Sequence, residues 1–247
     1  MNLGAKVVFI TGASSGIGAN LAKRYAAKGY KVGLLARRVA QLAELKSQIN
    51  AQSGIAEYAV CDVQDQEAVL RAVVDLKRAL GTPDLFIANA GIGGTQKIKT
   101  FSSESANKTF DVNVKGLFHC VEAVVPEMIK NGSGHFVGIS SLASFTSLPG
   151  MHVYAASKVA MRYFLSGMGL EIAKYGVDVS TICPGFIKTD LTAGRKSMPY
   201  LMELDDACER IEKAIEAKKE LYAFPKRLYW IIRLGNLLPN FIRNRLN

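Results

Sequence analysis

Short apolar runs alternate along this chain with longer segments of helical periodicity, and this alternation restricts the possible folds more than any other feature. The predicted strands are Lys6–Ile10, Lys31–Ala36, Ile55–Val60, Asp84–Ala88, Gly134–Ser140, Val177–Ile182 and Leu221–Phe224. The predicted helices are Ile17–Lys28, Val39–Asn50, Gln66–Leu80, Ser105–Lys130, Val153–Tyr175 and Asp205–Lys218. Near-continuous apolar strands separated by helices are typical of a parallel sheet covered on both faces. The sequence therefore predicts an α/β fold with a doubly wound parallel sheet of about seven strands.

The composition is that of a globular chain. Of its 247 residues, 49% are apolar and 21% are charged, which excludes an intrinsically disordered chain despite a net charge of +10. No run of about 18 apolar residues occurs, so we expect no membrane-spanning helix. Met1–Ala5 leads into the first strand without the pattern of a secretory signal, and we expect a cytoplasmic protein. The wide spacing of Cys61, Cys120, Cys183 and Cys208 favours free buried thiols over a metal site or disulfides.

A glycine-rich loop, Thr11-Gly12-Ala13-Ser14-Ser15-Gly16-Ile17-Gly18, stands between the first predicted strand and the first predicted helix. Its G-x-x-x-G-x-G spacing differs from the G-x-G-x-x-G dinucleotide fingerprint, but the same physics applies. Residues without a Cβ let the backbone approach a pyrophosphate, and the helix offers free N–H groups at the positive end of its dipole. The alternative is a tight turn and nothing more. The position of the loop favours a dinucleotide site.

Further candidate residues follow the next strands. After the second strand, Ala36 precedes Arg37 and Arg38, and no acid is present to bind a ribose 2′-OH. The two guanidinium groups suit a 2′-phosphate, unless they only begin a solvated helix. Asp62, after the third strand, could accept a hydrogen bond from an adenine amino group or cap a helix that begins near Gln64. The small residues of Asn89-Ala90-Gly91 would let a cofactor lie against the backbone.

Tyr154 and Lys158 lie four residues apart on a predicted helix and so share one face of it. A neighbouring cation lowers the pKa of a tyrosine from about 10, which makes the phenol able to transfer a proton near neutral pH. A Tyr-x-x-x-Lys pair alone is a weak signal, because such pairs also occur on helix surfaces. Ser141 lies 13 residues before Tyr154, and Asn113 lies 41 residues before it.

Together these residues resemble the short-chain dehydrogenase/reductase family. The matching positions are Thr11-Gly12-x-x-x-Gly16-x-Gly18, Asp62, Asn89-Ala90-Gly91, Asn113, Ser141, Tyr154-x-x-x-Lys158 and Pro184-Gly185. The resemblance extends from Lys6 to about Phe224, with no departure among the catalytic positions. It implies a Rossmann-type fold and a homodimer or homotetramer built through the two long helices, Ser105–Lys130 and Val153–Tyr175.

The resemblance also implies a reaction, the interconversion of a carbonyl and an alcohol by hydride transfer with NADP(H), which Arg37 and Arg38 favour over NAD(H). Tyr154 would be the acid or base, and Lys158 would lower its pKa and hold the nicotinamide ribose. Ser141 would orient the carbonyl oxygen and Asn113 would hold a water of a proton relay. The implied cofactor-binding residues are Gly12, Ser14, Ser15, Gly16, Ile17, Gly18, Arg37, Arg38, Asp62, Val63, Asn89, Ala90, Gly91, Tyr154, Lys158, Pro184, Gly185, Ile187 and Thr189.

The residues that follow the strand ends are mostly apolar, which predicts an apolar carbonyl or alcohol as substrate, unless they are ordinary core residues of a lid. The predicted substrate contacts are Ser141, Leu142, Phe145, Met151 and Phe186, with Ile92, Leu148, Met198 and Tyr200 as further candidates. Residues 191–204 are predicted to form a mobile lid. His152 has no role in the family pattern, and we interpret it as a residue at the rim of the pocket.

The C-terminal residues 226–247 are predicted to form an extension of the domain at residues 1–225. From Leu221 onward the chain carries five basic residues and no acid, and it contains the only tryptophan, Trp230. We expect two short helices hinged near Pro239, with Trp230, Ile231 and Leu238 on an apolar surface. Such a tail could make a peripheral membrane contact. Alternatively it packs on the domain, closes the substrate site or forms a subunit contact.

The sequence also bears on two other classes of function, a silent dinucleotide-binding protein and a nucleic-acid-binding protein. A catalytically silent dinucleotide-binding protein, regulatory or acting at a membrane surface, would not need Asn113, Ser141, Tyr154 and Lys158 together. A nucleic-acid-binding protein is suggested by the net charge of +10, but the chain contains no recognised nucleic-acid motif, so we expect no nucleic-acid partner.

Overall fold

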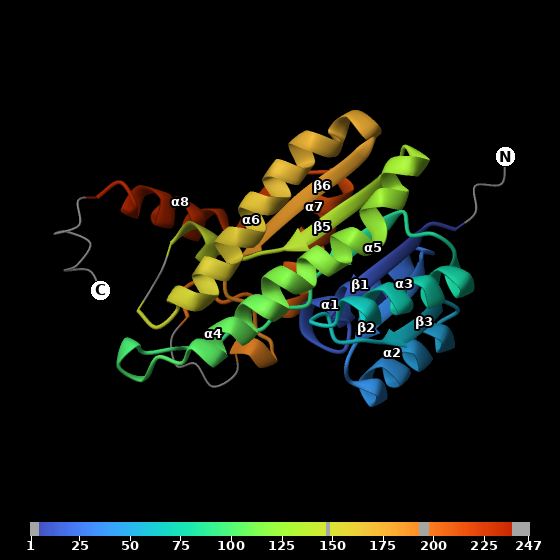
Figure 1. Cartoon of the computed structure of the whole chain (residues 1–247), viewed down its shortest axis with the longest axis horizontal. Helices are drawn as coiled ribbons and strands as arrows, with labels where there is room; N and C mark the ends of the chain where they lie inside the picture. The colour runs from blue at the N-terminus through green and yellow to red at the C-terminus, as the bar shows by residue number, and fades with distance from the viewer. Residues whose placement is uncertain (1–4, 147–148, 193–197, 239–247) are drawn as a thin grey trace.

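The computed structural model describes residues 5–146, 149–192 and 198–238. In this part of the chain, seven parallel strands form one sheet in the order β3-β2-β1-β4-β5-β6-β7 (Figure 1). The strands are β1 (Val7–Thr11), β2 (Lys31–Ala36), β3 (Ile55–Val60), β4 (Leu85–Ala88), β5 (Gly134–Ile139), β6 (Val177–Pro184) and β7 (Leu221–Phe224). The helices are α1 (Gly16–Ala27), α2 (Val39–Ala51), α3 (Gln66–Leu80), α4 (Ser103–Phe110), α5 (Gly116–Asn131), α6 (His152–Ile172), α7 (Leu204–Glu216) and α8 (Lys226–Gly235).

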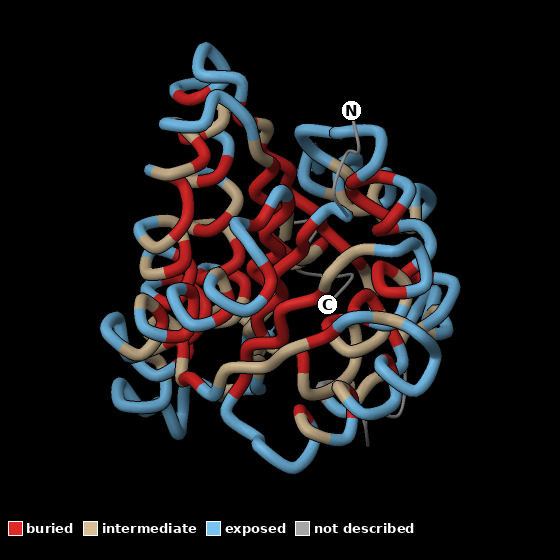
Figure 2. Tube along the Cα trace, turned by 90° about the vertical axis from the view of Figure 1, so that its right-hand side faces the viewer, coloured by how far each residue is buried: buried red, intermediate tan, exposed pale blue. Residues whose placement is uncertain are grey.

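Helices cover both faces of the sheet. Side chains alternate along β1, so Val8 and Ile10 enter one core cluster while Val7 and Phe9 enter the other. Helices α1, α2 and α7 complete the first cluster, and α3, α5 and α6 complete the second. Figure 1 shows α5 and α6 in front of β5 and β6 with α7 behind them, and Figure 2 shows the buried strands between more exposed helices. The predicted fold class is confirmed.

The order of the strands places the functional site. The chain proceeds from β1 outward to β2 and β3, and then returns to the other side of β1 to continue through β4. In open parallel sheets of this kind, ligands bind at the carboxyl ends of the strands where the order reverses. That point lies between the residues that follow β1 and the residues that follow β4. The four cysteines are free and buried, as expected.

The predicted helix Ser105–Lys130 is not a regular α-helix. Residues Asp111–Lys115 form a π-helical turn that joins α4 to α5. Such turns are rare and often occur at functional sites. The prediction of one continuous α-helix was wrong in this detail, because apolar periodicity does not distinguish one wide turn from its α-helical neighbours. At the start of α5, a Cβ on Gly116 would lie 2.8 Å from Val63 Cγ2, so this helix lies very close to the loop after β3.

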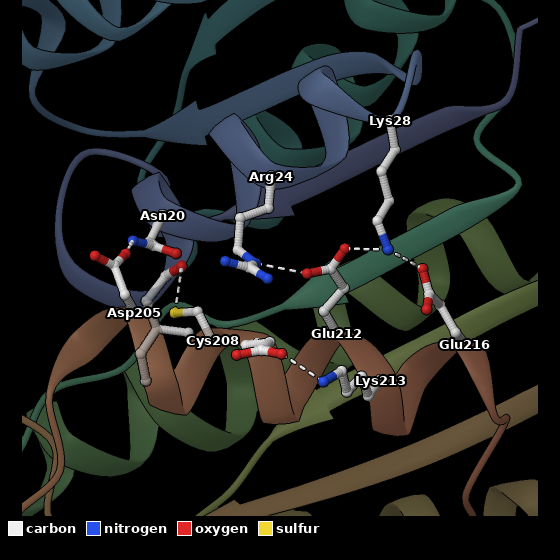
Figure 3. Close-up of polar contacts among 10 residues, drawn as sticks. Asn20, Arg24, Lys28, Asp205, Cys208, Glu212, Lys213 and Glu216 are labelled. Carbon is white, nitrogen blue, oxygen red and sulfur yellow. Dashed lines mark hydrogen bonds and ion pairs between the residues drawn. The ribbon is translucent and has the colours of Figure 1, made fainter.

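A polar cluster joins α1 to α7, as Figure 3 shows. Arg24 of α1 and Lys28, which directly follows the helix, form ion pairs with the buried Glu212 of α7, and Lys28 also pairs with Glu216. Asn20 Nδ2 donates a hydrogen bond to Asp205 Oδ1 at 2.5 Å. Burial disfavours the ionised form of Glu212, but hydrogen bonds from Lys28 and Arg24 outweigh burial and hold its pKa below the ordinary value. The cluster therefore ties the first helix of the chain to the seventh.

The helix α8 corresponds to the first of the two predicted tail helices. Leu228 is buried against Leu142, Cys183 and Ala223, so one side of α8 packs on the domain. Trp230 and Leu238, with Ile231, are exposed, as the apolar surface predicted for the tail requires. Pro239 and the basic residues beyond it lie outside the described residues. Among the helices of the described chain, none combines the length and the apolar character that crossing a membrane requires.

Candidate active site

A cavity of about 300 Å³ opens at the carboxyl ends of the central strands. Eighteen of the predicted cofactor residues line it: Gly12, Ser14, Ser15, Gly16, Ile17, Arg37, Arg38, Asp62, Val63, Asn89, Ala90, Gly91, Tyr154, Lys158, Pro184, Gly185, Ile187 and Thr189. Gly18 is not on the wall. A Cβ on Gly18 would lie 2.5 Å from Gly12 O, so its lack of a side chain lets α1 pack on the glycine loop.

The glycine loop has the properties of a phosphate site. Gly12 and Gly16 adopt φ values of +66° and +55°, in the left-handed region that favours glycine. A Cβ on Gly12 would also lie 2.9 Å from Ala90 Cα, so the loop is packed tightly against the residues after β4. The side chain of Ser15 makes no capping hydrogen bond at the start of α1, and no acid lies in the first turn. This helix end suits an anionic phosphate group.

The two arginines after β2 have different neighbours. Arg38 donates hydrogen bonds to two adjacent serines of the glycine loop. Its Nε and Nη2 atoms lie 3.1 and 2.9 Å from Ser14 Oγ, and Nη2 lies 2.6 Å from Ser15 Oγ. Arg37 Nη1 lies 3.4 Å from Asp62 Oδ2. Both arginines line the cavity, so a positive rim borders the loop.

The sequence left open whether Asp62 caps a helix or faces the cofactor site. Its Oδ1 atom accepts a hydrogen bond of 3.1 Å from Gln64 N, while α3 begins later, at Gln66, and is capped by Asp65. Burial disfavours the Asp62 carboxylate, but hydrogen bonds from Gln64 and the charge of Arg37 outweigh burial and hold its pKa below the ordinary value. Asp62 thus fixes the turn before the helix and also faces the cavity.

Asn113 is the residue that the π-turn brings inward. Its Oδ1 atom accepts a hydrogen bond of 2.8 Å from Ile92 N, and its Nδ2 atom donates to Ile92 O at 3.0 Å and to Ser157 Oγ at 2.9 Å. Ser157 Oγ in turn donates to Tyr154 O at 2.7 Å. The sequence analysis missed Ser157, although its position directly before Lys158 was a signal. This chain of bonds joins the π-turn to α6.

Lys158 of α6 lies close to Asn113. Its Nζ atom donates a hydrogen bond of 2.9 Å to Ile139 O and lies 5.8 Å from the centre of the Tyr154 ring. A Cβ on Gly91 would lie 3.3 Å from Lys158 Nζ and 3.2 Å from Asn113 Oδ1, so Asn113 and Lys158 both lie beside Gly91. With only 4% of its surface exposed, Lys158 has its pKa lowered by burial to about 8.

Replacing Lys158 with methionine is expected to stabilise the cofactor-free protein near neutral pH by about 1–3 kcal/mol, because a buried ammonium group is removed. The ordinary pKa of 10.5 applies to the unfolded chain, whereas the folded chain loses this proton at about pH 8. Between these pH values the unfolded state binds more protons, so the wild-type protein gains stability as pH rises. Urea unfolding of both proteins at about pH 7 and about pH 10 measures the difference, which must shrink with pH. A pH-independent difference, or a less stable variant at neutral pH, contradicts the prediction.

A second cavity, of about 270 Å³, meets the first at Ser141, Tyr154, Gly185 and Thr192. Most of its remaining wall is apolar: Gly93, Leu142, Ala143, Thr146, Met151, Phe186, Pro199, Leu228 and Ile232. Ser141 caps the short turn that follows β5 by accepting a hydrogen bond of 3.1 Å from Ala143 N. The turn thereby holds this hydroxyl at the junction of the two cavities.

Four of the five predicted substrate residues, Ser141, Leu142, Met151 and Phe186, line this second cavity. Phe145 does not, because its ring packs against Tyr229 of α8 at a centroid distance of 5.2 Å. The sequence analysis missed Leu228 and Ile232 as pocket residues. Their spacing of four residues on the amphipathic tail was the available signal.

The further substrate candidates and His152 do not all lie on a cavity wall. Ile92 lines the first cavity, while Met198 and Tyr200 line neither cavity and Leu148 lies outside the described residues. His152 packs against Phe101 at a centroid distance of 6.4 Å and lines neither cavity. Of the predicted lid, residues 193–197 lie outside the described residues.

Comparison with known proteins places this geometry in context. A family model for short chain dehydrogenases matches residues 6–199. An uncharacterized oxidoreductase of Myxococcus xanthus is 37% identical over 236 residues, which cover 95% of this chain and 93% of the relative. A short-chain dehydrogenase from Sphingobium yanoikuyae in complex with NADPH has a TM-score of 0.82 at 26% identity, covering 89% of this chain and 88% of that one. A short chain dehydrogenase/reductase from Burkholderia phymatum in complex with NAD shares the fold, with a TM-score of 0.87 at 23% identity over 96% of this chain and 94% of that one.

Proposed function

Because this chain is an oxidoreductase of the short-chain dehydrogenase/reductase family, we propose that it interconverts a carbonyl and an alcohol on an apolar substrate with NADP(H). One observation carries the proposal: Tyr154 and Ser141 line both the cavity bordered by the glycine loop and the apolar cavity beside it. A proton donor and a hydrogen-bond donor thus stand where a substrate and a dinucleotide would meet.

The residues of the first cavity fit a dinucleotide. Gly12 and Gly16 line the cavity in left-handed backbone conformations, and the start of α1 offers N–H groups without a side-chain cap. When bound, NADP(H) supplies or accepts the hydride at the substrate carbon. In the direction of reduction, Tyr154 gives its phenolic proton to the carbonyl oxygen, so that the C=O bond becomes CH–OH. Ser141 Oγ holds the same oxygen by a hydrogen bond.

Lys158 and Asn113 act on Tyr154 rather than on the substrate carbon. The ammonium group of Lys158, 5.8 Å from the centre of the Tyr154 ring, favours the phenolate that remains after proton transfer. Both N–H bonds of Asn113 Nδ2 have partners, and Oδ1 accepts from Ile92 N. An amide oxygen has two lone pairs, so Oδ1 can still hold a water of a proton relay.

The preference for NADP(H) rests on Arg37 and Arg38. Both guanidinium groups line the cavity beside the glycine loop, and no acid ends β2. A guanidinium binds phosphate through two parallel hydrogen bonds, whereas a ribose 2′-OH would require an acceptor at this position. Similar solved structures contain either cofactor, NADPH in the Sphingobium protein and NAD in the Burkholderia protein, so the proposed preference rests on these arginines alone.

Members of this family typically form oligomers, and exposed apolar side chains support a homodimer or homotetramer here. Phe118 of α5 and Tyr163 and Leu170 of α6 are all exposed in the single chain. Apolar side chains on two adjacent long helices are suited to a contact between subunits.

A cofactor-oxidation screen tests the proposed function. NADPH and NADH are each offered with aldehydes, ketones and acyl-chain carbonyls of graded length, and absorbance of the reduced nicotinamide is followed. We expect turnover with NADPH to exceed turnover with NADH, and kcat/KM to rise with apolar size until the second cavity is filled. Tight binding of NADPH without turnover on any substrate would instead favour a catalytically silent binding protein.

A further inference from the structure

Helix α8 has two apolar sides, of which only one is covered. On the inner side, Leu228 and Ile232 form part of the wall of the second cavity. The outer face of α8 and the turn after it carry apolar side chains with large exposed fractions: Trp230 57%, Ile231 55% and Leu234 61% on the helix, and Leu237 80% and Leu238 38% beyond its end. Figure 1 shows α8 projecting from one end of the molecule, beyond the N-terminal half of α6. Contiguous exposed apolar side chains of this kind mark an interaction surface.

The charged side chains of α8 all have one sign. Lys226, Arg227 and Arg233 are all exposed, and the sequence carries no acid from Leu221 to its last residue. Basic side chains with long apolar stems can lie along an apolar surface while their charged ends reach a polar layer. Tryptophan is likewise suited to the boundary between an apolar layer and water.

We propose that the outer face of α8 docks on the surface of an anionic lipid bilayer. Trp230 and Leu234 lie one turn apart on one side of α8, and Leu237 belongs to the turn that directly follows the helix. These three side chains would enter the boundary between headgroups and acyl chains. Arg227 and Arg233 would lie among the anionic headgroups. The apolar contacts supply attachment that salt affects little, and the basic residues supply attachment that salt weakens.

A second copy of this chain is a poorer occupant of the same face. In a two-fold dimer the same surface patch meets itself. Such a contact would bring Arg227 and Arg233 of the two copies together without any acid from α8, and juxtaposed like charges disfavour association. Charge complementarity therefore favours the anionic bilayer.

The unique tryptophan makes the proposal measurable without reference to catalysis. The full chain is mixed at low salt with vesicles of phosphatidylcholine and anionic phosphatidylglycerol, and in parallel with vesicles of phosphatidylcholine alone. With the anionic vesicles we expect a blue shift of Trp230 emission and sedimentation of the protein with the lipid. With phosphatidylcholine alone we expect weaker binding.

Paired variants separate the two contributions. Leu234→Gln with Leu237→Gln is expected to weaken partitioning about tenfold or more, because two exposed leucines lose their apolar contact. Arg227→Gln with Arg233→Gln is expected to weaken it about thirtyfold at low salt and to reduce the dependence on salt. Val74→Gln, which alters an exposed apolar side chain of α3, is the control and should bind like the wild type.

Three outcomes would overturn the proposal. The first is no binding of the full chain to anionic vesicles at low salt. The second is undiminished binding by both paired variants while their circular dichroism matches that of the wild type. The third is a Trp230 blue shift that grows with protein concentration in the absence of lipid and disappears in the leucine variant, because a second copy would then cover the face.

Discussion

Tyr154→Phe is expected to lower kcat roughly 100- to 10,000-fold while the affinity for NADP(H) stays close to that of the wild type. The substitution removes the phenolic proton and preserves the ring, which lies 5.8 Å from Lys158 Nζ in the wall of both cavities. Stopped turnover with retained cofactor binding therefore separates proton transfer from folding. Steady-state kinetics and calorimetric titration of NADPH measure the two quantities.

The matched control for this prediction lies just beyond the same helix. Tyr175 is 43% exposed and lines neither cavity, so Tyr175→Phe should leave kcat unchanged. A Tyr154→Phe protein that kept half of the wild-type rate would exclude Tyr154 as the acid or base.

The double variant Ala36→Asp, Arg37→Ala is expected to reverse the cofactor preference. Hydrogen bonds to a charged group contribute about 1.5–3 kcal/mol each, so one or two of them give the wild type a tenfold to several-hundredfold preference for NADP(H). In the variant, the new carboxylate at the end of β2 accepts hydrogen bonds from a ribose 2′-OH and repels a 2′-phosphate. Arg38 is left in place because it also binds Ser14 and Ser15 of the glycine loop.

Calorimetric titration with NADPH and NADH measures this reversal. Arg78→Ala, an exposed arginine of α3, serves as the control for the loss of one positive charge. Equal affinity of the unmodified protein for the two cofactors would contradict the assignment of Arg37 and Arg38 to the 2′-phosphate.

The first cavity was the part of the molecule most accessible from the sequence, because the residues that line it follow the strands in a fixed order. Gly12, Arg37, Asp62 and Asn89 each come within two residues of the end of one of the first four strands, and parallel strands bring their carboxyl ends to one edge. The strand pattern therefore located the site before any distance was known.

Other features depend on contacts that a local pattern does not contain. The π-turn at Asp111–Lys115 differs from an α-helix by its wider hydrogen-bonding, and the inward position of Asn113 follows from its bonds to Ile92 and Ser157. The part played by Leu228 and Ile232 depends on the direction in which α8 leaves β7. The exposure of Trp230 was predicted, and closure of the substrate site by the tail was one of the alternatives, but the residues of α8 that would form the pocket wall were not named.

The cluster that joins α1 to α7 also determines when the protein can finish folding. Arg24 and Glu212 are separated by 188 residues, so a nascent chain emerging from the ribosome presents α1 long before its partner has been synthesised. Until α7 arrives, Leu21 and Tyr25 of α1 lack part of the layer that buries them. Contacts of such long sequence separation form late and leave apolar surface open to aggregation in the meantime. One face of the sheet is therefore completed only after α7 and Phe224 of β7 have been synthesised.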